Sequence, residues 1–189
     1  MSYLSSLRIA TSDSHRFLDD HLRMTESSVS RERYVGFLRA TLSVVQAAEP
    51  SLSKFGLGSD VRRQDLLQKD LRALNAASPT HRVCVTSLNI ETLAEAYGAA
   101  YVIEGSALGG VVLSAHLSRV LPVEAHAFAY LRIYGGETKA RWSAFCASLD
   151  SWSERASLGD RERATNAALQ VFQEYANAFR LEGLWGQAN

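Results

Sequence analysis

The chain has 189 residues, of which 47% are hydrophobic and 21% charged, and its formal net charge at pH 7 is zero. This composition is typical of a soluble globular protein with one core, so we expect a single domain over residues 1–189. A neutral chain has no overall basic field to attract nucleic acid or an anionic membrane, and the pair Arg62-Arg63 is too short to form a basic patch.

The termini and the cysteines indicate the compartment. The N-terminal residues show no basic segment followed by an apolar one, and no run approaches the roughly 20 apolar residues that span a bilayer. Cys84 and Cys146 lack the spacing of a metal site and are too few for a disulfide framework, so we expect two reduced thiols. These features predict a cytoplasmic protein without a membrane partner.

Apolar residues repeat at steps of three and four through the first third of the chain, as in amphipathic helices. A first helix is expected over 4–22, with Thr11 and His15 on its apolar face. Ser30 can cap a second helix, which we expect to end at Pro50. A third helix should start near residue 59 or 60 and end near 74.

The remaining residues continue the same pattern. After a loop over 75–90, which contains Pro79, a long helix is expected from Asn89 or Glu91 to about residue 119. Pro122 can open the next helix, which ends near 134–136. Two further helices, at about 137–154 and 159–181, complete the chain. Since no segment alternates at period two for long enough to be a strand, we predict an all-α bundle of six to eight helices around one core.

Small residues interrupt the long helix at Gly105, Ser106, Gly109 and Gly110. A glycine inside a helix costs roughly 0.5–1 kcal/mol relative to alanine, so repeated glycines need a structural reason. One reason is a bend, or a backbone that lies against something flat. The ordinary alternative is that small residues let two helices pack closely.

A lone histidine says little by itself, because His15 could simply pack at a helix contact with one nitrogen hydrogen-bonded. His21 faces elsewhere on the helix, and the pairing of His15 with Asp19 one turn later is a weak metal signal. The combination with the glycines is more informative. An imidazole on one helix and bare backbone on another are what a haem held between two helices requires.

Two motifs carry a resemblance to a known family. They are Leu-Arg-x-x-Thr-x-x-x-His-x-x-Leu over 7–18 and Tyr-Val-Ile-Glu-Gly-Ser-x-Leu-Gly-Gly over 101–110. Further matches are Tyr134-Gly135, the Trp142-x-x-Phe145 pair, and a last helix with Phe172 and Phe179. In this order they resemble the haem oxygenase family, most closely its bacterial branch found beside phytochromes. This chain has Ser106 where mammalian members place an aspartate, and Val111 where a polar residue often follows.

The resemblance implies roles for particular residues. His15 becomes the proximal iron ligand, and the distal helix approaches the haem through Gly105, Ser106, Gly109 and Gly110. Arg8 matches a basic position that contacts a haem propionate, while Thr11 and Phe172 belong to matching motifs against the haem. Lys139 and Arg141 are further candidate propionate partners, and solvated helix charges are their alternative reading.

The implied activity is oxidative opening of haem, which is both cofactor and substrate, to biliverdin, Fe²⁺ and carbon monoxide. The chain has no fingerprint for flavin or nicotinamide, so the electrons for O2 activation must come from a ferredoxin-like protein or a small reductant, and a phytochrome is one acceptor for the biliverdin. A haem carrier or sensor without turnover is the alternative function. A di-metal carboxylate enzyme would need Glu-x-x-His pairs on facing helices, which we do not find.

Overall fold

The structure is a computed structural model that describes residues 2–76, 88–121 and 125–185. These residues form six α-helices and two short 3-10 helices and contain no strand, which confirms the predicted all-α fold. The elements are α1 (Tyr3–Leu22), α2 (Arg31–Lys54), α3 (Arg63–Ala73), α4 (Leu93–Val120), η1 (Ala125–Phe128), η2 (Gly135–Glu137), α5 (Thr138–Arg155) and α6 (Leu158–Leu181).

Side-chain caps explain where several helices begin. The hydroxyl of Ser30 accepts the backbone N–H of Arg33, so the predicted cap of α2 is confirmed. Helix α4 begins at a capping box. The hydroxyl of Thr92 accepts the backbone N–H of Glu95, and the carboxylate of Glu95 accepts the backbone N–H of Thr92. A Ser157–Asp160 box does the same for α6. The Thr-x-x-Glu spacing was visible in the sequence and places the start of α4 later than we expected.

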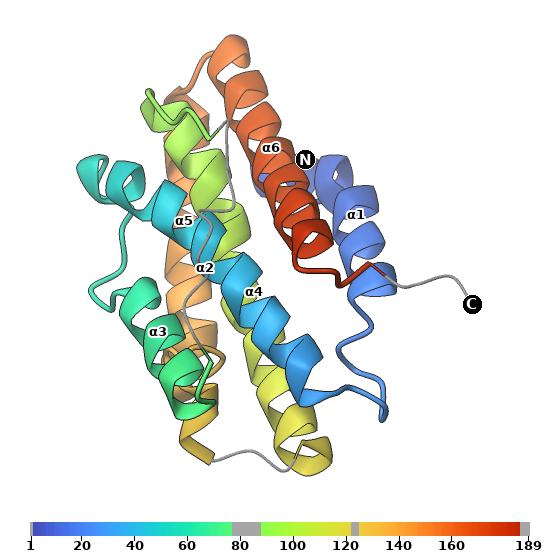
Figure 1. Cartoon of the computed structure of the whole chain (residues 1–189). Coiled ribbons are helices and arrows are strands. Elements are labelled where there is room, and N and C mark those ends of the chain that lie inside the picture. The colour runs from blue at the N-terminus through green and yellow to red at the C-terminus, as the bar shows by residue number, and fades with distance from the viewer. Residues whose placement is uncertain (1, 77–87, 122–124, 186–189) are drawn as a thin grey trace.

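The helices pack around one core, shown in Figure 1, where α1 and α6 lie side by side at one edge and α3 lies at the other. Helix α2 crosses the bundle between these edges and contacts α3, α4 and α6. The core is formed mainly by the buried faces of α2, α4 and α6, together with the segment between η1 and η2. Only three residues of α1 are buried, namely Leu7, Thr11 and Leu18. Helix α1 therefore covers the bundle without being enclosed by it.

One glycine that the sequence analysis did not single out permits the closest helix contact. A Cβ atom on Gly98 of α4 would stand 1.9 Å from the backbone oxygen of Ala164 in α6. Because no side chain fits there, the two helices cross with their backbones nearly touching. The close-packing explanation for small residues in this helix is therefore correct for Gly98.

Two helix boundaries differ from the predictions. Helix α2 continues through Pro50 to Lys54, because one lost hydrogen bond is outweighed by the burial of Leu52 in the following turn. Helix α3 starts at Arg63 rather than near residue 59 or 60, since Ser59 caps a turn by accepting the N–H of Val61. Helices α5 and α6 agree with the prediction to within a residue at each end.

The helix predicted from Pro122 to about residue 134 is wrong for the described part of that range. Within residues 125–134 only η1 is helical, and turns follow it. The N–H groups of Ala129 and Tyr130 bond to the carboxylate of Asp70 instead of to helix carbonyls. A tertiary partner has therefore replaced the local ladder. Pro79, Pro122 and Cys84 lie outside the described residues; Cys146 is a free thiol, as expected.

Helix α4 also corrects the expectation about apolar runs. Its 28 residues are long and apolar enough, by length and composition, to cross a bilayer. The core helix of a soluble protein passes the same test, and α4 packs against α2, α5 and α6 in this bundle. The finding is therefore weak evidence for a membrane span.

Candidate functional site

His15 projects from α1 with its side chain 66% exposed, at the edge of the helix's apolar stripe rather than inside it. Its Nδ1 atom lies 3.0 Å from Oδ2 of Asp19, one turn further along. When this carboxylate accepts the Nδ1 proton, the lone pair of Nε2 is left for another partner. In the part of the chain that the structure describes, Nε2 has no such partner. The arrangement leaves Nε2 of His15 open, as the predicted role of an iron ligand requires.

A pocket of about 350 Å³ opens beside this imidazole. It is lined by α1 and by one residue of α4: Arg8, Thr11, Ser12, His15, Arg16, Asp19, Asp20 and Tyr101. The hydroxyls of Thr11 and Tyr101 lie 3.4 Å apart and join the two helices. The pocket thus brings together both sequence motifs, since Tyr101 begins the glycine-containing one.

Of two further predicted residues, Arg8 lines the pocket and Phe172 lies against His15. The ring of Phe172 in α6 meets His15 edge to face, with ring centroids 6.0 Å apart, and this contact supports the orientation of the imidazole. Arg8 lines the pocket and lies near Cys146 of α5. Burial, the larger effect, raises the pKa of that thiol, while the positive charge of Arg8 acts in the opposite direction. Arg8 therefore carries a positive charge at the edge of the pocket.

The glycines of α4 differ in what they face. Nothing lies within 4 Å of the position that a Cβ on Gly109 would take, and Gly109 is exposed. A Cβ on Gly105 would make an ordinary 3.5 Å contact with Trp142. Gly110 points the other way, where a Cβ would stand 2.7 Å from the backbone oxygen of Leu131. Gly109 therefore leaves open space, whereas Gly110 admits a neighbouring segment.

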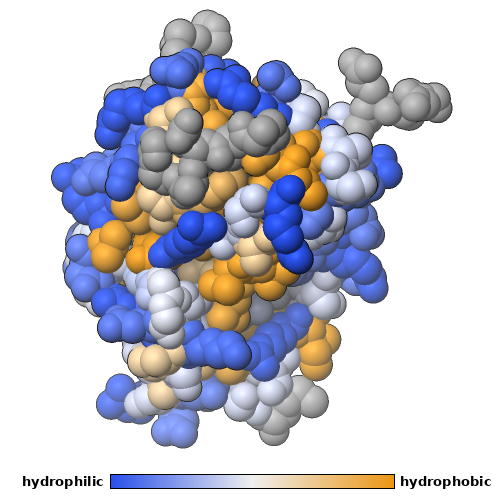
Figure 2. All heavy atoms as spheres, turned by 90° about the horizontal axis from the view of Figure 1, so that it is seen from below, coloured by the Kyte–Doolittle hydropathy of each residue, from blue (hydrophilic) through white to orange (hydrophobic). Residues whose placement is uncertain are grey.

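Apolar side chains are exposed on the same two helices. They are Ile9 and Phe17 of α1, and Val111 and Val112 of α4. Figure 2 shows hydrophobic residues in the middle of the face seen from below, with hydrophilic residues between and around them. Exposed apolar surface with a polar rim is typical of a ligand or partner site.

The structure does not place Lys139 or Arg141 among the residues that line the pocket. Lys139 is exposed, and Arg141 is engaged by carboxylates. The guanidinium of Arg141 binds Asp60 at 2.6 Å and Glu137 at 3.3 Å, and it lies over the ring of Tyr134. A role for Arg141 at a propionate would require it to leave these partners. For both residues the propionate role stays a prediction.

Sequence reasoning missed a buried ionic cluster behind α4. Arg63, set aside above as part of a short basic pair, is only 1% exposed and bonds to Glu104 of α4 and to the hydroxyl of Tyr134. Burial alone would lower the pKa of Arg63, but Glu104 and the neighbouring tyrosines together raise it, so the guanidinium stays charged. The Nη1 atom of Arg63 is 3.8 Å from Glu49 and has no hydrogen-bond partner. No sequence signal distinguishes Arg63 from the exposed Arg62 beside it.

A site with one histidine suits haem, because the porphyrin supplies the other four nitrogen ligands. The described residues contain no group of three or more metal-ligating side chains that would hold a bare ion. A single exposed imidazole beside a pocket therefore fits an iron porphyrin better than an isolated metal ion.

Comparisons with known proteins agree with this reading. The family model described as Heme oxygenase matches residues 1–181, so the chain belongs to the haem oxygenase family. Among solved structures, the fold is similar to the NO- and CO-bound heme oxygenase from Neisseria meningitidis, with a TM-score of 0.80 and 20% sequence identity. That match covers 100% of this chain and 96% of the other. At this identity the likeness shows the fold. No curated protein sequence matched the chain.

Proposed function

We propose that this protein is a haem oxygenase that uses O2 and external electrons to open haem to biliverdin, with release of iron and carbon monoxide. The observation that carries the proposal is the pocket beside the exposed, Asp19-bound imidazole of His15, which is also lined by Tyr101 of α4, the helix on which Gly109 leaves open space. When bound, haem supplies the oxygen-activating iron and the meso carbon that is oxidised.

The protein's own residues have separate tasks in this proposal. His15 binds the iron through Nε2, and Asp19 holds the imidazole by its other nitrogen. Phe172 supports the ring from α6. Arg8 neutralises a propionate at the edge of the pocket, and Lys139 and Arg141 are candidates for the same task.

The distal side is formed by α4. Gly109 would leave room for a diatomic ligand on a haem bound against this helix, and Gly105, one turn earlier, likewise carries no side chain. Ser106 is exposed on this helix, and its hydroxyl donates to the backbone oxygen of Ile103 at 2.7 Å. The Ser106 oxygen is therefore left to accept a proton from water or from a neighbouring hydroxyl. A histidine ligand would push less electron density onto the iron than a thiolate does, which would favour oxidation of the ring edge.

The electron donor in this proposal is a separate ferredoxin-like protein or a small reductant, and a phytochrome is a candidate acceptor for the biliverdin. We place the protein in the cytoplasm. A haem carrier or sensor would share the same His15 and glycines, so turnover is the property that separates the two functions.

The test is to add haem to the purified protein, record its visible spectrum, and then supply ascorbate in air. We expect a bound-haem Soret band, its loss on reduction under oxygen, and a bilin identified by chromatography. His15→Ala should lose the ordinary Soret spectrum or most of the turnover, while His21→Ala, on the same helix but outside the pocket lining, should keep both. Protein that binds haem and never opens the ring would indicate the carrier instead.

A further inference from the structure

Helix α1 forms most of the candidate haem pocket although little of the helix is buried. Seven of the eight residues that line the pocket belong to α1, and the eighth is Tyr101 of α4. Within the helix only Leu7, Thr11 and Leu18 are buried. Because few of its side chains enter the core, the position of α1 depends strongly on what holds its two ends.

The N-terminal end of α1 is bonded to the last two helices. The hydroxyl of Tyr3 donates to the backbone oxygen of Arg161 in α6 at 2.8 Å. The backbone N–H of Leu4 donates to the carboxylate of Asp150 in α5 at 3.2 Å. This end is therefore fixed on α5 and α6.

The C-terminal end of α1 is bonded to Arg33 of α2. The last four carbonyl groups of a helix have no partner within it. The guanidinium of Arg33 supplies partners for two of them. Its Nε donates to the backbone oxygen of Leu22 at 3.0 Å, and its Nη2 donates to those of His21 at 3.1 Å and Leu22 at 2.9 Å. The positive charge also suits this end of α1, which is the negative end of the helix dipole.

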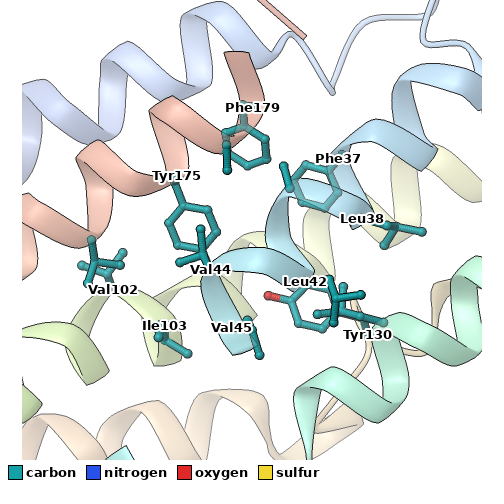
Figure 3. Close-up of a cluster of buried hydrophobic side chains, with 14 of the residues drawn as sticks. Phe37, Leu38, Leu42, Val44, Val45, Val102, Ile103, Tyr130, Tyr175 and Phe179 are labelled. Carbon is teal, nitrogen blue, oxygen red and sulfur yellow. The ribbon is translucent and has the colours of Figure 1, made fainter. Parts of the chain in front are cut away.

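The same guanidinium binds the segment that follows α6. The Nη2 atom of Arg33 also donates to the backbone oxygen of Leu184 at 2.8 Å. Gly36 of α2 admits the side chain of Leu184, since a Cβ there would stand 3.1 Å from its Cδ2 atom. Figure 3 shows Phe37 of α2 beside Phe179 of α6, and these two rings stack with centroids 5.6 Å apart. Arg33 therefore extends from a part of α2 that is packed firmly against α6.

His15 lies two turns before the carbonyl groups that Arg33 binds. Leu22 is seven positions after His15, which is about 10 Å along the helix axis. Over two turns a helix moves nearly as a rigid body, so a shift of its end also moves the imidazole. Across the pocket, the hydroxyls of Thr11 and Tyr101 are 3.4 Å apart, which is too long for this contact to hold α1 by itself.

We propose that Arg33 is a positioning residue, which fixes the C-terminal end of α1 on α2 and so sets the position of His15 relative to α4. The inference rests on the proposed function. Arg33 is not among the residues that line the pocket, so it acts through the backbone of α1 and does not touch the ligand. Such indirect support matters because a misplacement of about 1 Å at a reacting centre can cost up to about 100-fold in rate.

The first test needs no haem. Arg33→Met removes the donors but keeps an apolar side chain, and we expect faster amide hydrogen exchange in a peptide covering residues 15–23. A peptide covering residues 3–11, at the end held by α5 and α6, should exchange as in the parent protein.

Arg31→Met is the matched control for this experiment. The guanidinium of Arg31, in the same turn of α2, donates to the backbone oxygen of Leu74 after α3 instead. Its loss should leave the exchange of residues 15–23 unchanged. Exchange of that peptide in Arg33→Met equal to that of the parent protein would overturn the proposed positioning.

The second test uses the haem-loaded protein and the iron–histidine stretching band, which resonance Raman spectroscopy detects in the ferrous state. We expect Arg33→Met to shift this band and to lower the single-turnover rate of haem opening by roughly 10-fold. Arg33→Lys keeps the charge but is shorter and lacks the planar fork, so both values should fall between those of Arg33→Met and the parent. Arg31→Met should keep the parent band and rate. A loss of stability alone would not move the band of the folded, haem-loaded protein.

These outcomes separate the inference from the proposed function. If the parent protein binds and opens haem while Arg33→Met keeps the parent band and rate, the positioning role is wrong. If the parent protein fails to bind haem, the proposed function is wrong, and with it the role of Arg33 at a haem site, whereas hydrogen exchange still reports whether Arg33 fixes the end of α1. Should Arg33→Met fail to fold, Arg33→Lys decides, and a parent band and rate in that variant would contradict the inference.

Discussion

The Nδ1 atom of His15 lies 3.0 Å from Oδ2 of Asp19 although both side chains are largely exposed, at 66% and 69%. An exposed pair of this kind contributes little to stability, so its value lies in orienting the imidazole. The sequence contained this i, i+4 pair, which was a weak signal until the structure placed it at the mouth of a pocket.

Asp19→Ala should weaken haem binding by about 10- to 100-fold, the usual cost of losing a hydrogen-bond partner of a metal-bound histidine. Titration of the Soret band measures the affinity. Asp13→Ala removes a carboxylate of the same helix that pairs with Arg16 and lies outside the pocket lining, and should change the affinity little. Equal affinities for the two variants would show that Asp19 does not support the ligand.

The two adjacent glycines of α4 should respond in opposite ways to alanine. Gly110→Ala places a Cβ 2.7 Å from the Leu131 oxygen and should destabilise the fold by about 1–3 kcal/mol. Gly109→Ala meets open space, so the haem-free protein should gain up to about 1 kcal/mol from helix propensity. Its haem affinity should nevertheless fall, because the new methyl group occupies the open face. Thermal unfolding without haem and Soret titration measure the two effects; a stable Gly110→Ala protein would contradict the first.

Removing the buried guanidinium of Arg63 should reduce the free energy of unfolding far more than removing the exposed guanidinium of Arg62. Arg63→Met leaves Glu104 beside Glu49 without a buried cation and should destabilise the protein by about 3–5 kcal/mol. Arg62→Met removes a guanidinium that is 68% exposed and should cost less than about 1 kcal/mol. Urea denaturation of the haem-free variants measures both. Similar midpoints for the two would mean that the ionic cluster does not stabilise the bundle.

The capping box of α4 should make part of the stability depend on pH. Burial, the largest single effect, raises the pKa of Glu95, but bonds from the N–H groups of Glu91 and Thr92 and from the Thr92 hydroxyl together lower it below 4.5. A carboxyl whose pKa is lower in the folded protein stabilises the fold above its unfolded pKa and stops doing so as the pH falls through the folded value.

Glu95→Gln should therefore destabilise the protein by about 0.3–1 kcal/mol at pH 7, and the difference from the parent should shrink as the pH falls below 4.5. Urea denaturation of the variant and the parent protein at a series of pH values measures this difference in the free energy of unfolding. Glu154→Gln, an exposed carboxyl of α5 outside any capping box, is the control and should show no such trend. A difference that grows towards acid pH would have the wrong sign.

The residues that the sequence could reveal are those whose neighbours lie within a few turns of the same helix. His15, Asp19 and the run from Gly105 to Gly110 show their spacing directly, and so do the helix caps at Ser30 and Thr92. The residues that it could not reveal depend on partners distant in the chain. Arg63 and Arg62 are identical in type, and only packing against Glu104 and Tyr134 separates them.

The segment after Pro122 shows the same limit. Its sequence predicted a helix, yet the N–H groups of Ala129 and Tyr130 turn to a carboxylate on α3, a partner no local pattern contains.

By itself, the sequence determined the all-α class, most helix boundaries and the family motifs, because hydrophobic periodicity and capping are local properties of the chain. The tertiary structure decided which face each glycine presents, which arginine is buried and how Tyr130 is held. Those properties depend on the desolvation and close approach of groups that meet only when separate helices pack together.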